Sequence, residues 1–334
     1  MIQSDSQLLP SRSPGLPQVP IVPRAVQRLR AGIPLVLRTD VATEPPSDCE
    51  DVLLCDLRGQ PIATALWVAS GPLAARLWSM TGERFDEETI ATRLKAALHR
   101  RRPILTGGER DAFRLVHGEA DLLPGLFVDC YADAAVIQTA TSAMDRRKTE
   151  IADLLMQLLP LARVLLRDDG SARDMESLPR EKGFLRGGPL RMARFHDAGS
   201  TMEADLLFDR KTGSFLDQQE NHLEVAKWAE SLCGGGEALD AFTYHGGFAL
   251  ALARAGLLDG RTVTTHWEDI ADLRARFPEL TMKEDCRWVD EGEIVTSGGI
   301  SAGIDMSLHL VARLAGRELA VATARQMEVE WREG

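Results

Sequence analysis

The segment LDAFTYHGGFALALA, Leu239 to Ala253, decides the fold that we expect for this chain. The pattern predicts a short strand from Ala238 to Phe242. A turn with Gly246 and Gly247 follows, and Phe248 to Ala255 then has the composition of a helix. Strand, glycine turn and helix in this order open a doubly wound α/β sheet. We therefore predict an α/β chain with a Rossmann-like parallel sheet on its C-terminal side.

The rest of the chain divides into further predicted domains. We expect a flexible leader rich in Ser and Pro at residues 1–20, a small β-rich barrel-like module at 21–104, an α+β middle domain at 105–193 and the Rossmann-like α/β domain at 194–334. Within the middle domain, the pattern predicts one amphipathic helix from Met144 to Leu159 and a glycine-rich turn region from Gly183 to Pro189.

The C-terminal domain has its own predicted elements. A helix over Leu216 to Leu232 has Asp217 as its expected cap and Trp228 among its apolar positions. A parallel sheet should continue from Ala238 to Phe242 into a strand from Arg261 to Trp267. The expected elements after this strand are a hairpin of Arg287 to Val289 with Glu293 to Thr296, and helices over Ser301 to Leu314 and Glu318 to Met327.

Charge is unevenly distributed along the chain, whose formal net charge is −11. Residues 1–104 carry 13 Lys and Arg against 11 Asp and Glu, whereas the remainder carries 26 against 39. We therefore expect any contact with nucleic acid in the N-terminal part, at Arg24, Arg28, Arg30 and Arg38 or at His99 to Arg102. The same arginines can instead simply solvate surface helices.

Cysteine usage and hydropathy indicate the surroundings in which the chain works. The five cysteines are scattered without a CxxC pair, which fits a reducing cytoplasm and argues against a disulfide framework or a metal site. No apolar run reaches the length that crosses a membrane, so we expect no membrane partner.

Three long segments resemble the RlmI-like (YccW-like) ribosomal RNA methyltransferases. They are RLVHGEADLLPGLFVDCYADAAVIQT (Arg114 to Thr139), FDRKTGSFLDQQENH (Phe208 to His222) and LDAFTYHGGFALALA. The N-terminal stretches IPLVLRTDV and ATALWVASGPLAARLWS resemble the PUA domain of that family. The resemblance covers roughly residues 20–255. It implies a PUA-like RNA-binding module, ribosomal RNA as partner and methylation of carbon-5 of a cytosine, with S-adenosylmethionine as cofactor.

The resemblance also implies site residues. The residues expected to hold the cofactor are Lys211, Thr212, Phe215, Asp217, Gln218, Asp240, Tyr244, Gly246 and Gly247. The spacing of Rossmann-like sites adds Glu268, and the charge distribution makes Arg24, Arg28 and Arg38 the residues expected to hold RNA. We expect Lys211, Thr212, Phe215, Asp217 and Gln218 to face the cofactor cleft.

Physical reasons support the cofactor contacts. A glycine turn lets the backbone approach a ligand, and the helix after it offers unpaired N–H groups to the methionine carboxylate. Asp240 is placed to hold the ammonium group. Glu268, 22 residues after Gly246, can hold the ribose hydroxyls. The turn can equally join a strand to a helix without a ligand, and Glu268 can be a solvated acid. The family usually has arginines where this chain has Gln219 and His222.

The residues that perform the transfer in this family have no counterpart in the chain. Enzymes of this type add a thiolate to carbon-6 of the base and hold the base with an Asp-Pro-Pro motif. The chain contains no Asp-Pro-Pro, and Cys286, in KEDCRWVD, is the only cysteine after the glycine turn. Its acidic neighbours oppose thiolate formation, so we expect a structural role. Catalytic residues stay unassigned, and a non-catalytic RNA-binding protein is the alternative.

The C-terminal part resembles the second half of PfpI/ThiJ-like proteins over about residues 252–334. The resemblance rests on AGLLDGRTVTTHWEDIADLRARFPE and VDEGEIVTSGGISAGIDMSLHLVARLAGRELAVATARQM. It implies a hydrolase or sensor that lacks its nucleophile, because Tyr244 stands where that family has its cysteine. It also implies that His266 is a hydrogen-bonded core residue and that the C-terminal helices form a homodimer.

Overall fold

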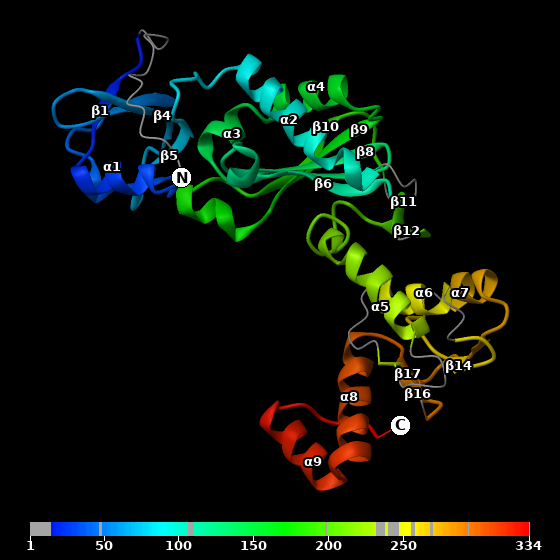
Figure 1. Cartoon of the computed structure of the whole chain (residues 1–334). Coiled ribbons are helices and arrows are strands. Elements are labelled where there is room, and N and C mark those ends of the chain that lie inside the picture. Colours follow the sequence, from blue (N-terminus) through cyan, green and yellow to red (C-terminus); the bar gives the residue numbers. More distant parts are fainter. Residues whose placement is uncertain are drawn as a thin grey trace. The chain divides into compact units, whose positions relative to one another are not determined.

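The computed structural model describes residues 15–46, 49–105, 110–190, 192–197, 199–231, 238–239, 247–254, 258–267, 270–292 and 294–333 (Figure 1). The chain forms two compact units. Unit 1 contains Met1–His196 and Glu203–Ser214, and unit 2 contains Asp197–Met202 and Phe215–Gly334.

The first sheet of unit 1 has five strands in the order β1-β3-β4-β5-β2. Its elements, with the helix packed beside it, are β1 (Gln18–Pro20), α1 (Pro23–Arg30), β2 (Leu35–Leu37), η1 (Arg38–Asp40), β3 (Asp51–Cys55), β4 (Pro61–Trp67) and β5 (Leu73–Ser79). β1 pairs with β3 in parallel, and the other neighbours pair antiparallel. An antiparallel bridge between Ile21 and Val41 links the segments that follow the two edge strands. Apolar side chains from all five strands and α1 form one buried core.

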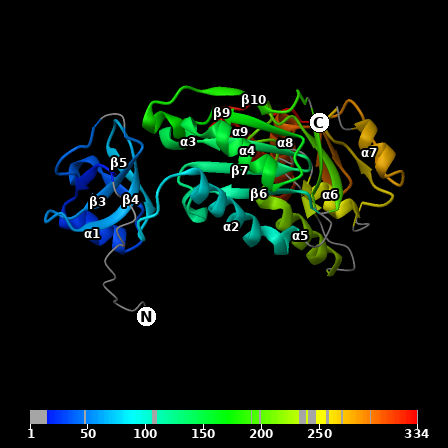
Figure 2. The same cartoon turned by 90° about the horizontal axis from the view of Figure 1, so that it is seen from above.

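The second sheet of unit 1 also has five strands, in the order β10-β9-β8-β7-β6. Its elements, with the helices packed on it, are α2 (Glu87–Leu105), β6 (Ala112–His117), η2 (Gly118–Asp121), β7 (Leu126–Tyr131), β8 (Ala134–Thr139), α3 (Ser142–Arg146), α4 (Lys148–Leu158), β9 (Arg163–Asp168), η3 (Ser171–Glu176) and β10 (Glu181–Arg186). α3 and α4 connect the parallel strands β8 and β9. α2 contacts both α4 and β6 (Figure 2). Ile90, Leu94, Ile151 and Leu155 of the helices pack against the sheet in one core.

Three predictions for unit 1 need correction. The leader does not extend to residue 20, because Gln18–Pro20 is a strand whose Val19 is fully buried. The expected turn region from Gly183 is mostly strand, because β10 pairs along β9. The single helix expected from Met144 is two helices that meet at Arg147, whose guanidinium packs over the ring of Phe85.

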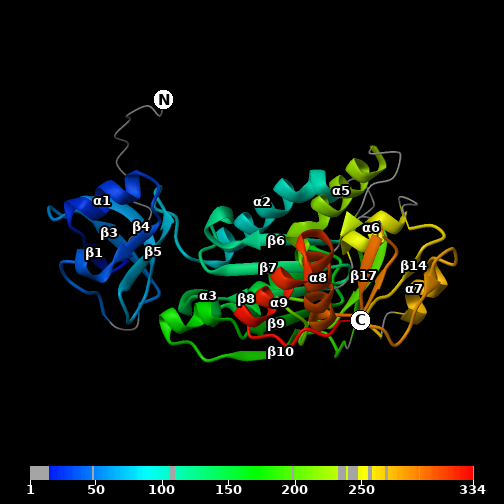
Figure 3. The ribbon, with the colours of Figure 1, turned by 90° about the horizontal axis from the view of Figure 1, so that it is seen from below.

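Unit 2 combines short strands with six helices among its described residues. Its elements are η4 (Leu216–Gln218), α5 (Gln219–Ser231), β13 (Ala238–Leu239), α6 (Gly247–Arg254), β14 (Thr262–Val263), α7 (Ile270–Arg276), β15 (Thr281–Met282), β16 (Trp288–Asp290), β17 (Ile294–Ser297), α8 (Ile300–Ala315) and α9 (Arg317–Gln326). β13 pairs in parallel with β17, and β16 pairs antiparallel with β17, which confirms the predicted hairpin. α8 and α9 confirm the two helices predicted at the C-terminal end, and they pack against each other (Figure 3). A separate hairpin of β11 (Ala193–Asp197) and β12 (Ser200–Ala204) spans the boundary between the units in sequence.

Two predictions for unit 2 also differ from the structure. The strand expected over 261–267 is only β14, and it pairs in parallel with β15 rather than with β13. The backbone N–H of Thr264 donates to the side-chain hydroxyl of Thr296, so this N–H does not extend the backbone pairing of β14. On α5, Trp228 is 65% exposed, although its spacing predicted a buried face. In the part of the chain that the structure describes, no helix is long and apolar enough to span a membrane.

Candidate functional site

A buried hydrogen-bond network fixes the segment FDRKTGS to β7 within unit 1. The Thr212 hydroxyl donates to the Asp129 carboxylate at 2.6 Å and lies 3.0 Å from the Tyr131 hydroxyl. The backbone N–H of Ser214 donates to the same Tyr131 oxygen at 3.1 Å. Arg114 donates to both oxygens of Asp129, at 2.7 and 2.8 Å. Burial, together with the charge of Asp129, raises the pKa of Tyr131, so its hydroxyl stays protonated and donates.

The backbone of this segment is bent so that one cation faces outward. Gly213 has a φ of +136°, and a Cβ there would lie 2.7 Å from the Leu206 side chain, so only glycine fits. Lys211 adopts the left-handed conformation at φ +54°, and its side chain is exposed. Thr212 is 1% exposed. Our expectation that Thr212 faces an open cleft therefore needs correction, because its hydroxyl is committed to the sheet of unit 1.

A second polar cluster surrounds Gly247 in unit 2, at the first residue of α6. A Cβ on Gly247 would overlap the imidazole of His222, so this ring packs directly on the glycine. Nδ1 of His222 lies 3.4 Å from Oδ2 of Asp197. Among the described residues, Oδ1 of Asp197 and Nε2 of Gln219 are buried without a hydrogen-bond partner. Buried polar atoms in native proteins generally have partners, so these two atoms are candidates for ligand contacts.

The other predicted cofactor residues are only partly placed. Phe215 and Gln218 are half-buried and Asp217 is exposed, all at the start of unit 2. Oε1 of Gln218 accepts a hydrogen bond from the Asn221 amide at 2.9 Å. The remaining four predicted residues lie outside the described part of the chain, namely Asp240, Tyr244, Gly246 and Glu268.

The arginines predicted to bind RNA lie on α1 and η1, beside the first sheet, and have partners within the protein. Arg24 and Arg28 both pair with the buried carboxylate of Asp40. Burial raises the pKa of Asp40, but hydrogen bonds from the two arginines outweigh burial and hold the pKa below its ordinary value. Arg38 donates to the backbone carbonyls of Val68 and Gly71. These side chains therefore tie the turns of the sheet together, and Arg24, at 65% side-chain exposure, is the most open of them.

Three acids of unit 1 bring their oxygens within 4.8 Å of one another, which is close enough to surround a cation. They are Asp145, Asp168 and Glu181. The buried guanidinium of Arg173 already pairs with Asp168 at 2.7 Å and with Asp145 at 2.9 Å. Lys148 pairs with Glu181. The protein's own cations therefore neutralise this cluster.

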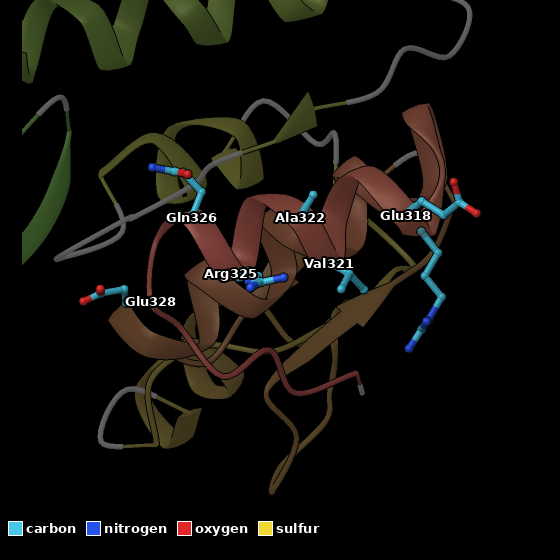
Figure 4. Close-up of a pocket in the computed structure, with 7 residues that line it drawn as sticks. Glu318, Val321, Ala322, Arg325, Gln326 and Glu328 are labelled. Carbon is cyan, nitrogen blue, oxygen red and sulfur yellow. The ribbon is translucent and has the colours of Figure 1, made fainter.

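A surface hollow of about 610 Å³ lies along α9 (Figure 4). Figure 4 shows Glu318 and Arg325 on either side of Val321 and Ala322. All the lining residues lie in or just after this one helix, and none of the predicted site residues is among them. We therefore do not place the functional site there.

Comparison with known proteins relates part of the chain to rRNA methyltransferases. The chain is 29% identical over 214 residues to "Ribosomal RNA large subunit methyltransferase I" of Tolumonas auensis. The aligned region covers 63% of this chain and 53% of that protein. A homologue from Pseudoalteromonas translucida is 30% identical over 62% of this chain. About 60% of this chain is homologous to ribosomal RNA large subunit methyltransferase I. The chain spans about half the length of these relatives. No family model matches the chain.

Solved structures show the fold that the chain shares. A structure assigned as a SAM-dependent methyltransferase from Streptococcus mutans has a TM-score of 0.65 and 17% identity, and covers 89% of this chain and 74% of its own. SMU.776, assigned as a methyltransferase and complexed with SAH, has a TM-score of 0.60 and 16% identity over 92% of this chain and 83% of its own. At these identities the likeness shows the mixed α/β fold alone.

The C-terminal resemblance stays a prediction. A DJ-1 superfamily protein from Salmonella typhimurium is 28% identical over 25% of this chain and 43% of its own, with a TM-score of 0.22. Such a score decides nothing about the fold. The PfpI/ThiJ-like hydrolase or sensor and the homodimer therefore stay predictions as well.

Sequence reasoning missed the residues that hold the predicted motif in place. Asp129 and Tyr131 lie inside a quoted family segment, and their alternation along a strand could have indicated that both point to one side. Asp197 gave no such signal, because it lies in a short hairpin far from the glycine turn in sequence. His222 was noted only as a departure from the family.

Proposed function

We propose that this chain is an S-adenosylmethionine-dependent methyltransferase that acts on ribosomal RNA, with carbon-5 of a cytosine as its target. The observation that carries the proposal is the placement of the segment Phe208 to His222. Its Thr212 is locked into unit 1, and its last residue, His222, packs on Gly247 of the glycine turn in unit 2. This segment also carries the resemblance, and the homologues bear the name of this activity.

We assign the RNA-binding role to unit 1. Residues 21–104 would form the PUA-like module and residues 105–193 the α+β middle domain. Residues 194–334 would form the Rossmann-like domain that holds the cofactor. The homologues' name, which refers to large-subunit ribosomal RNA, supports this partner.

The polar atoms around Gly247 suit the amino-acid end of S-adenosylmethionine. Oδ1 of Asp197 is an acceptor and Nε2 of Gln219 is a donor, and both are buried without partners among the described residues. An α-ammonium group satisfies the first atom and an α-carboxylate the second. Asp240, next to the turn, is the further acid that the resemblance implies for the ammonium. The cofactor, when bound, supplies an electrophilic methyl group.

The residues of this chain then have positioning roles. Asp197 orients the imidazole of His222 through its second carboxylate oxygen, and the ring covers Gly247. The network of Asp129 and Thr212 fixes the backbone from which Lys211 extends. An exposed cation at this point is suited to a phosphate of the RNA.

A second candidate function is RNA binding without methyl transfer. It is favoured by the absence of an Asp-Pro-Pro sequence from the chain. It is also favoured by Cys286, whose thiol lies 3.7 Å from the carbonyl oxygen of Lys283, to which it donates. The sulfur thus contacts the protein's own backbone, and Cys286 is the only cysteine that follows the glycine turn in the sequence.

The two candidates differ in a single pair of measurements. Isothermal calorimetry with S-adenosylmethionine measures cofactor binding, and transfer of a labelled methyl group to ribosomal RNA measures activity. Binding together with transfer supports the methyltransferase. RNA binding without transfer supports the second candidate, and absence of both cofactor binding and RNA binding contradicts both.

Variants sharpen the assignment of the cofactor site. Asp197→Asn should weaken S-adenosylmethionine binding about tenfold or more, because a charge-assisted hydrogen bond contributes about 1.5–3 kcal/mol. Lys227→Gln, an exposed change elsewhere on α5, is the matched control and should bind as the wild type does. Equal affinity of both variants would remove Asp197 from the site.

A further inference from the structure

One face of α2 carries three exposed basic residues, which we name the α2 stripe; its cations are the Lys and the Arg, and the His lies between them. The three residues are Lys95, His99 and Arg102, at helical spacings of four and three residues. This spacing places them within about 60° of one another around the helix, with axial separations of about 6 and 4.5 Å. In the part of the chain that the structure describes, the side chains of these three residues form no hydrogen bond or ion pair.

Among the described residues, the acids that pair with α2 are already bound by arginines, and the acids of α2 itself lie in its first turn. Asp121, which is 2% exposed, accepts hydrogen bonds from both Arg100 and Arg101. Two cations therefore share one carboxylate, and a net positive charge remains beside the stripe. The last acid of α2 is Glu88, seven residues and about 10 Å before Lys95 along the axis.

This arrangement differs from that of the arginines on α1 and η1. Arg24 and Arg28 share Asp40, and Arg38 is held by backbone carbonyls. A phosphate would have to replace those bonds, whereas the α2 stripe offers cations that make no competing contact. The chain as a whole carries a net charge of −11, so a helix half with no acid after Glu88 is a marked local exception.

We propose that the α2 stripe is the phosphate-docking surface on which RNA lies. The inference rests on the proposed function, since it names the surface that this function needs. Neighbouring exposed positions on the helix are Thr92 and Ala96, which offer no large apolar side chain. A membrane surface requires apolar anchors beside the cations, so the phosphate backbone of RNA is the better match. Cations in the last turns of a helix also stabilise that helix through its dipole. The salt dependence of RNA binding, measured below, distinguishes phosphate docking from this structural role.

The test compares the salt dependence of RNA binding in two matched double variants of the full chain. Lys95→Gln/Arg102→Gln removes two stripe cations, and Lys227→Gln/Arg325→Gln removes one Lys and one Arg from exposed helix faces of unit 2. The probe is a fluorescently labelled single-stranded RNA of mixed sequence, titrated between about 50 and 200 mM salt. The stripe variant should lower the slope of log K against log salt by about 1.4, since each phosphate contact contributes about 0.7. The control should keep the wild-type slope.

A second readout needs no variant. Acetylation of the wild-type chain, followed by mass spectrometry, should show Lys95 protected by RNA and Lys227 unprotected. Two results would contradict the proposal that RNA docks on the α2 stripe: an unchanged slope for the stripe variant, or equal acetylation of Lys95 with and without RNA. Either result leaves RNA binding elsewhere on the chain, and the proposed function, in place. If the wild-type chain does not bind RNA, both the docking role of the α2 stripe and the RNA-binding part of the proposed function are wrong.

Discussion

The hydroxyl of Thr212 donates a 2.6 Å hydrogen bond to the carboxylate of Asp129, which lies 83 residues earlier in the chain. Both side chains are almost fully buried, so water does not replace this bond. The bond joins two of the three segments that resemble the methyltransferase family. The segment with Lys211 and Gly213 is therefore held by the sheet of unit 1 as well as by local backbone bonds, such as that from the Gly213 N–H to the Arg210 carbonyl.

Replacement of Thr212 by Val should lower the free energy of unfolding by about 1–3 kcal/mol, because two buried groups each lose a hydrogen bond. The Asp129 carboxylate keeps only its bonds from Arg114, and the Tyr131 hydroxyl loses the oxygen to which it donates. Urea denaturation of the full chain measures the change. Thr212→Ser is the control, since it keeps the hydroxyl and loses only a methyl group. A valine variant as stable as the serine variant would contradict the role of this bond.

Gly247→Ala should destabilise unit 2, because the added Cβ overlaps the imidazole of His222. Overpacking of this kind typically destabilises by about 1–3 kcal/mol. The change in unfolding free energy should be largely absent when the alanine is introduced into a His222→Ala background. A double-mutant cycle by thermal or urea unfolding measures the coupling, which we expect at about 0.5–3 kcal/mol for residues in contact. Additive effects of the two changes would mean that the ring does not pack on the glycine.

The regular elements were predicted best where local pattern decides the outcome. The hairpin of Trp288–Asp290 with Ile294–Ser297 and the two helices after it follow from alternation and helical spacing. β10 was missed because Gly183 reads as a turn residue, whereas the neighbouring strand β9 offers a full row of backbone partners. A pairing between strands of different segments is invisible to local propensity.

The candidate site was predicted less well, because its contacts are long-range. Thr212 was expected to face a cleft, and nothing in its neighbourhood reveals that Asp129 will take its hydroxyl. Likewise, the charge of Arg24 suggests an RNA contact, but Asp40, which binds it, lies 16 residues away. Sequence identifies which residue types gather in a motif, whereas burial decides which of them remain open to a ligand.

Arg173→Met should be among the most destabilising single changes in unit 1. The guanidinium is 2% exposed and donates to Asp168, to Asp145 and to the backbone carbonyl of Thr139. Removing one partner of a buried ion pair typically destabilises by about 3–5 kcal/mol, because the other charge stays buried alone. Burial already raises the pKa of Asp168, so its carboxyl would become protonated more readily in the variant.

The double variant Arg173→Met/Asp168→Asn serves as the control for this prediction. It removes the uncompensated charge, so it should recover part of the lost stability in urea denaturation. A single variant within about 1 kcal/mol of the wild type would show that the pair is not a buried ion pair of ordinary strength.

The carboxylate of Asp121 should make the stability of unit 1 depend on pH in the acid range. Burial raises its pKa, but hydrogen bonds from Arg101 and Arg100 and from the backbone of His117 outweigh burial, so the pKa in the folded chain lies below its ordinary value of 3.8. A depressed carboxyl pKa contributes stability that is fully present above the ordinary value and is lost as pH falls through the folded value.

Asp121→Asn isolates this contribution. At neutral pH the variant should be less stable than the wild type by about 1–3 kcal/mol, because the two arginines lose their charged partner. The difference should shrink as pH falls below 3.8 toward the folded pKa, since the wild-type carboxyl is then protonated as well. Urea denaturation at a series of pH values measures it. Asp174→Asn, in an exposed pair with Arg180, should change stability by less than about 1 kcal/mol at every pH. A difference between Asp121→Asn and the wild type that stayed constant down to the lowest pH would assign the effect to packing instead of charge.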